Sequence, residues 1–165
     1  MGRWSYSNRR TVEDCKTITT MFLNEHNYFD GDVRRGGMNW SRNGEETGSI
    51  GYEVSTIGSN EYIRFQYTQT DRNTDEKTKL DYKARLTWTP CYFGGIRWWF
   101  ICPQVVNAHA CGKRVGSLYL EGKRFGCRHC YNLTYASSQE SHKYDGLFRK
   151  IGFTIQEARL AFPGV

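Results

Sequence analysis

The chain has 165 residues, with 23 Lys and Arg against 17 Asp and Glu, and six cysteines. This length suits one domain, or one small domain with an appended module, and it buries a core without disulfides. Aromatic residues make up 15% of the sequence, which argues against a disordered chain. Three prolines and the lack of any repeated period exclude collagen-like, low-complexity and solenoid folds.

The net charge of +6 is concentrated in the C-terminal part of the chain. Residues 1–90 carry 13 basic and 13 acidic side chains, whereas residues 91–165 carry 10 basic and 4 acidic ones. A local basic excess favours an anionic partner, and the alternative is a solubilising surface. No segment offers the roughly 18 apolar residues of a membrane span, and the N-terminus lacks a signal-peptide core. We therefore expect a cytoplasmic protein with reduced cysteines and no membrane partner.

A helical pattern follows Thr11, which is a candidate N-cap before two acidic residues. Cys15, Ile18, Met21 and Phe22 then recur at spacings of three and four residues. We predict an amphipathic helix over residues 12–25, with Cys15 in the core.

Alternating apolar and polar residues dominate residues 37–101 and predict consecutive antiparallel strands joined by short turns. Residues 80–88 show the clearest alternation. Residues 96–101 carry large side chains on both faces, which predicts a strand covered on both sides. Two further short strands are expected over residues 115–120 and 124–126.

Capping signatures predict helices at the C-terminal end. Ser137 and Glu140 form a capping box that opens a helix over residues 138–151. Thr154 and Glu157 repeat the signature and open a short final helix.

The fold class we predict is α+β and mainly β. It comprises an N-terminal helix, an antiparallel meander, a four-cysteine zinc ribbon and one or two short C-terminal helices. The expected domains are residues 1–95 (helix plus β-rich domain), 96–136 (zinc ribbon) and 137–165 (C-terminal helices).

Four cysteines have the spacing of a zinc ribbon. Fifteen residues separate the Cys102/Cys111 pair from a Cys-x2-Cys turn, and two such turns facing each other across a hairpin provide a tetrahedral site. The first turn is unusual because residues 104–110 enlarge the loop between its cysteines. We predict one structural zinc ion (Zn2+) with no open coordination position, which stabilises residues 96–131. Its ligands are Cys102, Cys111, Cys127 and Cys130.

Other interpretations of the cysteines stay open at this point. A disulfide framework is one, although a reducing compartment argues against it. A redox site at Cys127 and Cys130 is another, but the βαβ pattern that usually surrounds it is absent. His109 is an alternative to Cys111 as a ligand, and Cys91 is a further alternative ligand, although a small buried residue is the simpler interpretation of Cys91. His129 is expected to point outward.

Short segments within residues 36–140 carry a distinctive pattern: RWWFICP at 97–103, CGKRV at 111–115, LYL at 118–120 and FGCRHCYNLTY at 125–135, with WSR at 40–42 and TGSI at 47–50 upstream. The pattern resembles an uncharacterised bacterial family, often met in phage-like or mobile DNA, with an N-terminal β-rich region and a C-terminal zinc ribbon. The resemblance implies zinc through the same four cysteines, and it implies no established activity. The family often continues with a longer basic segment, whereas this chain stops at Val165.

Basic and aromatic side chains interleave between residues 91 and 135, and this pattern predicts nucleic-acid binding (DNA or RNA). Cations contact phosphates, and exposed rings stack on unpaired bases. Core packing is the alternative for Trp98, Phe100 and Phe125, and a solvated loop is the alternative for the basic pairs. The predicted nucleic-acid contacts are Arg97, Lys113, Arg114, Lys123, Arg124 and Arg128.

A second function class is a protein-interaction module or inhibitor that binds a host or phage protein complex, because zinc ribbons also serve as docking modules. An enzyme is the third class. The sequence shows no Gly-rich phosphate loop, no metallohydrolase His cluster and no nucleophile–base arrangement. We therefore expect a non-catalytic protein without a small-molecule substrate.

Overall fold

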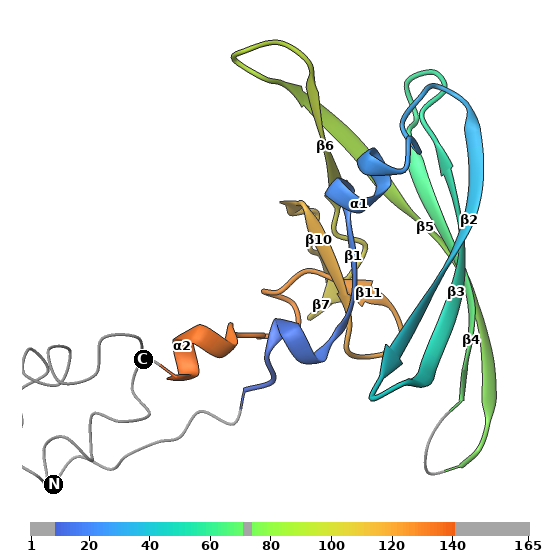
Figure 1. Cartoon of the computed structure of the whole chain (residues 1–165), viewed down its shortest axis with the longest axis vertical. Coiled ribbons are helices and arrows are strands. Elements are labelled where there is room, and N and C mark those ends of the chain that lie inside the picture. The colour runs from blue at the N-terminus through green and yellow to red at the C-terminus, as the bar shows by residue number, and fades with distance from the viewer. Residues whose placement is uncertain (1–8, 71–73, 141–165) are drawn as a thin grey trace, which may run out of the picture. The chain divides into compact units, whose positions relative to one another are not determined.

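The computed structural model describes residues 9–70 and 74–140 (Figure 1). These residues belong to two compact units. The larger unit is Cys15–Tyr131, and the smaller one combines the two terminal segments, of which residues 9–14 and 132–140 are described. Strands predominate over helices, which confirms a mainly β protein.

The larger unit contains one long antiparallel sheet, whose strands pair in the order β2-β3-β4-β5-β6-β9. The first five strands follow one another along the chain, which confirms the predicted meander. Asn43 and Gly44 join the first two strands with φ angles of 54° and 85°, as a two-residue hairpin turn requires. The strand bounds are β2 Val33–Arg42, β3 Glu45–Ser55, β4 Tyr62–Thr70, β5 Lys77–Pro90, β6 Ile96–Ile101 and β9 Arg114–Val115.

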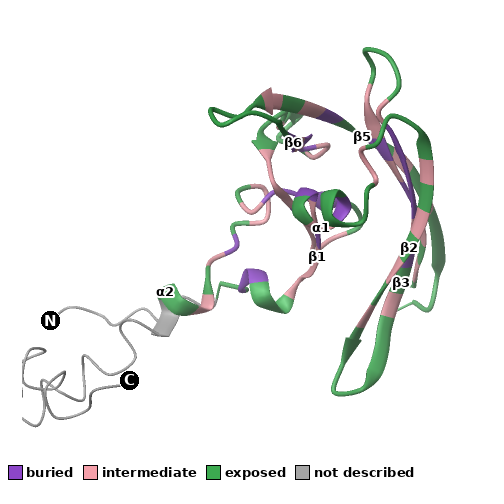
Figure 2. Ribbon diagram, turned by 45° about the horizontal axis from the view of Figure 1, so that its top comes forward, coloured by how far each residue is buried: buried purple, intermediate pink, exposed green. Residues whose placement is uncertain are grey.

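A smaller antiparallel sheet packs on the inner face of the long sheet (Figure 1). It comprises β1 (Lys16–Thr19), β10 (Ser117–Leu120) and β11 (Phe125–Gly126), and helix α1 (Thr20–Glu25) follows β1. The pairing of β1 with β10 places Ile18 opposite Leu118, and both side chains are buried. Figure 2 shows the buried positions along the inner strands and α1, whereas the hairpin ends are exposed.

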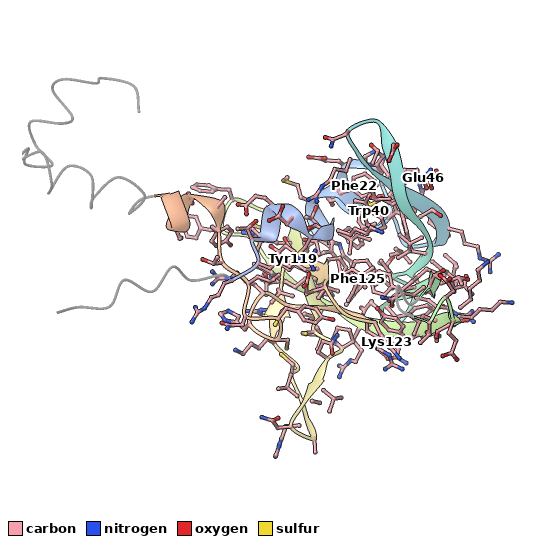
Figure 3. All side chains as sticks on the ribbon, turned by 90° about the horizontal axis from the view of Figure 1, so that it is seen from below. Phe22, Trp40, Glu46, Tyr119, Lys123 and Phe125 are labelled. Atoms are coloured by element: carbon pink, nitrogen blue, oxygen red, sulfur yellow. The ribbon has the colours of Figure 1, made fainter. Side chains whose placement is uncertain are left out.

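Phe125 joins the two sheets in one hydrophobic core. Its fully buried ring stacks on Phe65 with 4.8 Å between centroids, and it lies 6.0 Å from Tyr67 and 6.3 Å from Trp40 (Figure 3). The Phe125 backbone N–H also donates to the hydroxyl of Tyr82 at 2.6 Å. Burial of each such apolar side chain stabilises the fold by about 1.5–3 kcal/mol. The strands beside the predicted ribbon therefore share a core with the long sheet.

The predicted helix over residues 12–25 is wrong. The structure instead has a 3-10 turn at Val12–Asp14, strand β1 and then α1, which begins at Thr20. The hydroxyl of Thr19 accepts the N–H of Phe22 at 3.0 Å and caps α1 at its N-terminus. The residues before this cap extend because they pair with a strand that lies about 100 residues later in the chain.

The expected apolar stripe on that helix is also incorrect. Met21 is 68% exposed. Cys15 is half-buried, and its Sγ lies 3.5 Å from Glu121 Oε2. Neither side chain belongs to the core, because the spacing of three and four residues spans a strand and a helix rather than one helix.

The smaller unit is held together by a parallel bridge between Thr11 and Thr134. Helix α2 (Ala136–Glu140) begins two residues earlier than predicted, so Ser137 lies inside the helix rather than before it. The carboxylate of Glu13 accepts the backbone N–H of Ala136 at 3.1 Å and replaces the expected serine cap. The rest of the helix expected over residues 138–151, and the helix expected after Thr154, lie outside the described residues. In the described part of the chain, no helix has the length and apolar character to cross a membrane.

Candidate metal centre

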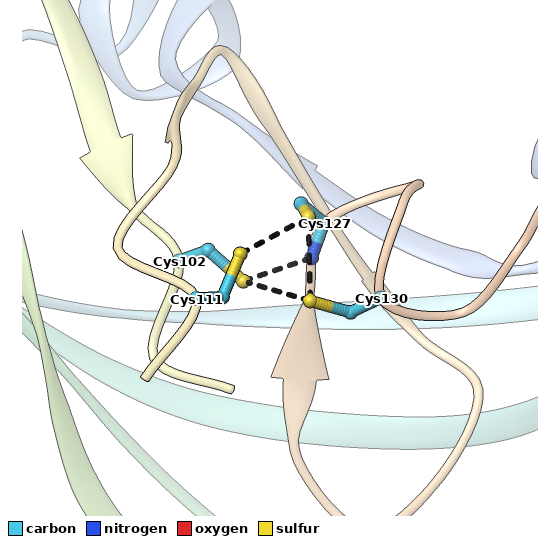
Figure 4. A group of neighbouring side chains, drawn as sticks. All are labelled: Cys102, Cys111, Cys127 and Cys130. Carbon is cyan, nitrogen blue, oxygen red and sulfur yellow. Dashed lines mark hydrogen bonds between the residues drawn. The ribbon is translucent and has the colours of Figure 1, made fainter. Parts of the chain in front are cut away.

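The four predicted ligand cysteines come together in space (Figure 4). Their Sγ atoms all lie within 4.8 Å of one another. The Sγ–Sγ distances are 3.8 Å for Cys102–Cys130, 3.8 Å for Cys111–Cys127 and 3.5 Å for Cys127–Cys130. A tetrahedral site with metal–sulfur bonds of about 2.3 Å has sulfur–sulfur edges of about 3.8 Å. These four thiols are therefore close enough to coordinate one metal ion.

The first cysteine turn is a hairpin rather than an irregular loop. Strands β7 (Val105–Val106) and β8 (His109–Ala110) pair between Cys102 and Cys111. Asn107 and Ala108 form the two-residue turn, with φ angles of 51° and 63°. The N–H of Cys111 donates to the carbonyl of Gln104 at 2.8 Å, which closes the base of the hairpin. The enlarged loop between Cys102 and Cys111 thus still brings these two cysteines together at the base of the hairpin.

The second cysteine turn follows β11 directly. The N–H of Cys130 donates to the carbonyl of Cys127 at 3.1 Å, which forms the tight turn expected from their spacing. The N–H of Cys127 donates to Sγ of Cys102 at 3.2 Å, so a backbone group of the second turn stabilises a sulfur of the first. Such donors favour the charged thiolate that a metal ion needs.

Two further residues that the sequence analysis missed connect the turns. The side-chain Nε2 of Gln104 donates to the Tyr131 hydroxyl at 2.6 Å and to the Arg124 carbonyl at 3.0 Å. The Tyr131 hydroxyl also donates to the Arg124 carbonyl. Gly126 leaves room for this contact, because a Cβ there would lie 2.5 Å from Gln104 Cγ and 2.9 Å from Tyr131 Cε2. The glycine before Cys127 was the one signal in the sequence for this close packing.

The pKa values of the thiols indicate the cost of ionising them, which a bound metal ion has to offset. Burial raises the pKa of Cys102 to about 11, and burial together with hydrogen bonds to Cys111 and Cys127 raises the pKa of Cys130. Burial opposes ionisation of Cys111 too, but hydrogen bonds from the Lys113 backbone and the neighbouring thiols lower its pKa. A metal ion supplies the positive charge that offsets the cost of several thiolates in a small volume.

The alternative ligands lie elsewhere. Within residues 9–70 and 74–140, these four cysteines are the one group of three or more metal-type side chains that converge. His109 is exposed, and its Nδ1 lies 2.8 Å from the Asn107 carbonyl oxygen. Cys91 is exposed in the β5–β6 turn, so its expected burial is wrong. His129 is exposed, as predicted.

The structure places the predicted basic residues in separate groups. Arg97 and Arg114 both stack on Trp99, with their guanidinium carbons 4.3 Å and 5.5 Å from its ring centroid. Arg124 lies 5.1 Å from the ring centroid of Tyr82. Five of the six are exposed and Arg128 is half-buried. The exposed ones are Arg97, Lys113, Arg114, Lys123 and Arg124.

Core packing explains three of the aromatic residues from the same region. Trp98 is 7% exposed, and Phe100 and Phe125 are fully buried. Trp99, between two of them on β6, faces the other side of the strand, and its indole N–H donates to the Thr89 hydroxyl at 2.9 Å. Trp99 is half-buried, and it is therefore the β6 aromatic residue that stays partly accessible beside basic side chains.

Comparisons with protein-family models, curated proteins and solved structures found no match to this chain. The resemblance to a bacterial zinc-ribbon family therefore stays a prediction.

Proposed function

We propose that this chain is a non-catalytic nucleic-acid-binding protein whose four cysteines hold one structural zinc ion. The observation that carries the proposal is Trp99 with two arginines stacked on it, on the outer face of the strands that lead into the cysteine turns. Arginine binds phosphate, and an accessible aromatic ring stacks on a base.

The donor set supports zinc. Four thiolate sulfurs in a tetrahedral arrangement suit zinc or an iron–sulfur centre and do not suit magnesium or calcium. Four protein ligands leave no position for water or substrate, which is the pattern of a structural site. The ion would fix the end of β6, because Cys102 directly follows that strand and its N–H donates to the Lys113 carbonyl at 2.9 Å.

The charge of the surrounding sequence supports an anionic partner. No Asp or Glu occurs between Asp81 and Glu121, whereas this stretch contains five basic residues. It forms most of β5, all of β6 and the cysteine hairpin. Phosphates that approach Arg97 and Arg114 therefore meet no carboxylate from this stretch of chain.

A polar cleft in the larger unit offers little for acid–base chemistry. The cleft has a volume of about 750 Å³, and its described lining includes Lys16, Trp40, Tyr67 and Gln69 but no His, Cys, Asp or Glu. Lys16 donates to the Thr47 carbonyl. Burial and the hydrogen bond to Tyr82 raise the pKa of Tyr67, so its hydroxyl stays protonated. This lining supports binding rather than catalysis.

A protein-interaction module is the second candidate function, and strand β2 favours it. This ten-residue strand forms the outer edge of the long sheet. An extended segment of a host or phage protein would pair with such an edge through backbone hydrogen bonds.

The test of nucleic-acid binding uses the zinc-loaded full chain with duplex DNA, single-stranded DNA and RNA in a salt series. We expect binding that weakens steeply with salt, and we expect Arg97→Ala/Arg114→Ala to reduce both the affinity and the salt dependence. Lys77→Ala/Lys79→Ala removes the same charge from exposed positions at the other end of β5 and is the matched control. No binding by the wild-type chain at low salt would refute this proposal in favour of a protein partner.

Metal content is tested separately. Elemental analysis of the purified chain is expected to give about one zinc per molecule. Cys127→Ser/Cys130→Ser is expected to abolish it, whereas Cys15→Ser, which changes a cysteine outside the cluster, is expected to retain it. Zinc that persists in the first variant contradicts the ligand assignment.

A further inference from the structure

The turn between β5 and β6 presents two aromatic rings to solvent. Tyr92 is 95% exposed and Phe93 is 96% exposed. Their rings lie 5.1 Å apart between centroids and are nearly perpendicular to each other. Aromatic side chains this large are normally buried in a core or an interface, and two adjacent ones at full exposure need an explanation.

This turn has a defined shape. The N–H of Cys91 donates to the Gly95 carbonyl at 3.0 Å, and the N–H of Gly94 donates to the Cys91 carbonyl at 3.1 Å. Gly94 and Gly95 have φ angles of 89° and 79°, which glycine adopts without strain. The backbone thus reverses within a few residues and leaves both rings at the end of the hairpin, which extends away from the rest of the long sheet (Figure 1).

The exposed apolar surface continues along the hairpin. Among the described residues, ten large hydrophobic side chains are exposed, and four of them lie here: Trp88, Tyr92, Phe93 and Ile96. Strand β6 was predicted to be covered on both faces, but Ile96 is 52% exposed and Arg97 is exposed. The prediction is wrong at this end of the strand, whereas Trp98 and Phe100 further along β6 are buried, with the Phe29 ring stacked on Trp98 at 4.8 Å between centroids.

Basic residues follow directly after the exposed apolar residues of the turn. The apolar tip is Tyr92, Phe93 and Ile96, and the basic face is Arg97 and Arg114. Arg97 follows Ile96 and stacks on Trp99, and Arg114 reaches the same ring from the neighbouring strand β9. The hairpin therefore combines exposed rings with cations and, between Asp81 and Glu121, contains no acidic residue. A partner that matches both features is a polyanion that also offers flat apolar groups.

Single-stranded nucleic acid has this combination, because its phosphates carry the charge and its unpaired bases are free to stack. Paired bases of a duplex are already stacked on one another and meet the tip only at a cost in unstacking. Three of the four exposed apolar residues on the hairpin are aromatic, and each ring offers a flat face on which an unpaired base stacks.

Building on the nucleic-acid-binding function proposed above, we propose that Tyr92 and Phe93 stack on unpaired bases and that the partner is a single strand whose phosphates pass Arg97 and Arg114. Arginines supply the charge-dependent part of the affinity, and the aromatic tip supplies the preference for single strands over duplex.

The test compares Tyr92→Ala/Phe93→Ala with the wild-type full chain, both loaded with zinc. The probes are single-stranded DNA and RNA of about 12 nucleotides, within the site sizes of single-strand-binding modules, and a DNA duplex of the same sequence. We expect the variant to lose at least about tenfold in affinity for the single strands, as loss of aromatic stacking on bases does. We expect duplex binding to change by less than about twofold and the salt slope to stay the same, because phosphate contacts are unchanged.

Three further variants separate stacking from general hydrophobicity and from loss of folding. Tyr92→Leu/Phe93→Leu keeps apolar side chains without rings and is expected to bind single strands as weakly as the alanine variant, whereas Tyr92→Trp/Phe93→Trp is expected to retain wild-type affinity. Met21→Ala/Ile57→Ala removes two other exposed apolar side chains and is expected to have no effect. Quenching of 2-aminopurine in the strand reports the stacking directly, and full binding by the leucine variant overturns the proposal.

The binding results distinguish a failure of the stacking role of Tyr92 and Phe93 from a failure of the nucleic-acid-binding function itself. If Arg97→Ala/Arg114→Ala weakens binding while Tyr92→Ala/Phe93→Ala leaves the single-strand preference unchanged, the nucleic-acid function stands and the role of the tip is overturned. If the wild-type chain binds none of the three nucleic acids at low salt, both are overturned. Binding of the wild-type chain to phosphatidylserine vesicles that only the tip variant loses, with unchanged oligonucleotide binding, also overturns the stacking role in favour of a membrane surface.

Discussion

Replacing Phe125 with alanine removes the side chain that joins the two sheets of the larger unit. The ring is fully buried and stacks on Phe65 at 4.8 Å. Phe→Ala changes in packed cores cost about 3–5 kcal/mol, through the lost transfer free energy and the cavity that remains. Since small domains unfold with a free energy of roughly 5–15 kcal/mol, this one substitution removes a large part of the stability.

Urea unfolding of the zinc-loaded protein measures the effect. With a denaturant slope of about 2 kcal/mol/M, the midpoint is expected to fall by about 1.5–2.5 M. Phe125→Leu retains much of the apolar volume and is expected to cost less, and Ile57→Ala, at an exposed position, is expected to stay within about 0.5 kcal/mol of the wild type.

The same substitution tests whether the core supports the cysteine cluster. Cys127 follows Phe125 by two residues, and its N–H donates to Cys102 Sγ at 3.2 Å. Zinc affinity, measured by competition with a chromophoric chelator, is therefore expected to fall together with stability. A loss of less than about 1 kcal/mol in Phe125→Ala, with unchanged zinc affinity, would show that the two sheets do not share one core.

Three other substitutions have defined outcomes. Ala108 adopts a φ of 63° in the β7–β8 turn, so Ala108→Gly is expected to raise the free energy of unfolding by about 0.5–1 kcal/mol, and a lower Tm of the zinc-loaded protein would contradict this turn geometry. Gln104→Ala removes the contacts to Tyr131 and is expected to weaken zinc binding about 10–100-fold, measured by chelator competition, and unchanged affinity would show that this contact does not orient the cysteine turns. The hydrogen-bonded Arg64 guanidinium lowers the pKa of Asp81, so this ion pair stabilises the fold above the ordinary aspartate pKa and loses its contribution as the pH falls through the lowered pKa. Urea unfolding at several pH values should therefore show that Asp81→Asn is less stable than the wild type at neutral pH. The difference in the free energy of unfolding should vanish in acid, and a difference that grows as the pH falls would contradict the ion pair.

Local patterns predicted the features whose partners lie nearby in the chain. The alternation in β5 and the short turns between successive strands depend on neighbouring residues, and the structure has this alternation and a two-residue turn at Asn43 and Gly44. The convergence of the four cysteines was predicted because their spacing alone restricts how they meet. In each case the pattern and the contact belong to the same short stretch or to a well-defined motif.

Features that depend on distant contacts were not predictable in this way. Strand β1 exists because Ile18 pairs with Leu118, and the spacing around Ile18 imitates a helix period. The contact of Gln104 with Tyr131 follows from the meeting of two turns, and its one sequence signal is Gly126, which lies far from Gln104 in the chain. The exposure of Cys91 in the β5–β6 turn is likewise not signalled by the residues around it.

We expect the proposed zinc ion and the proposed binding face to be coupled through strand β9. Arg114 pairs with Ile101 at the end of β6, and the Cys102 N–H donates to the Lys113 carbonyl at 2.9 Å, so the register of β9 against β6 is set beside the cysteine cluster. If the four cysteines hold zinc as proposed, its loss is expected to remove the restraint on both cysteines that border this ladder. Arg114, whose guanidinium carbon lies 5.5 Å from the ring centroid of Trp99, is then expected to leave its place over that ring.

The consequence is testable with the full chain before and after removal of zinc by a chelator. In the zinc-loaded chain, Arg114→Ala is expected to weaken nucleic-acid binding, whereas in the zinc-free chain the same substitution is expected to have little further effect. Arg97 lies within β6, ahead of the cysteines, and Arg97→Ala is the control that is expected to weaken binding in both states. If Arg114→Ala has the same effect with and without zinc, the metal does not position the binding face.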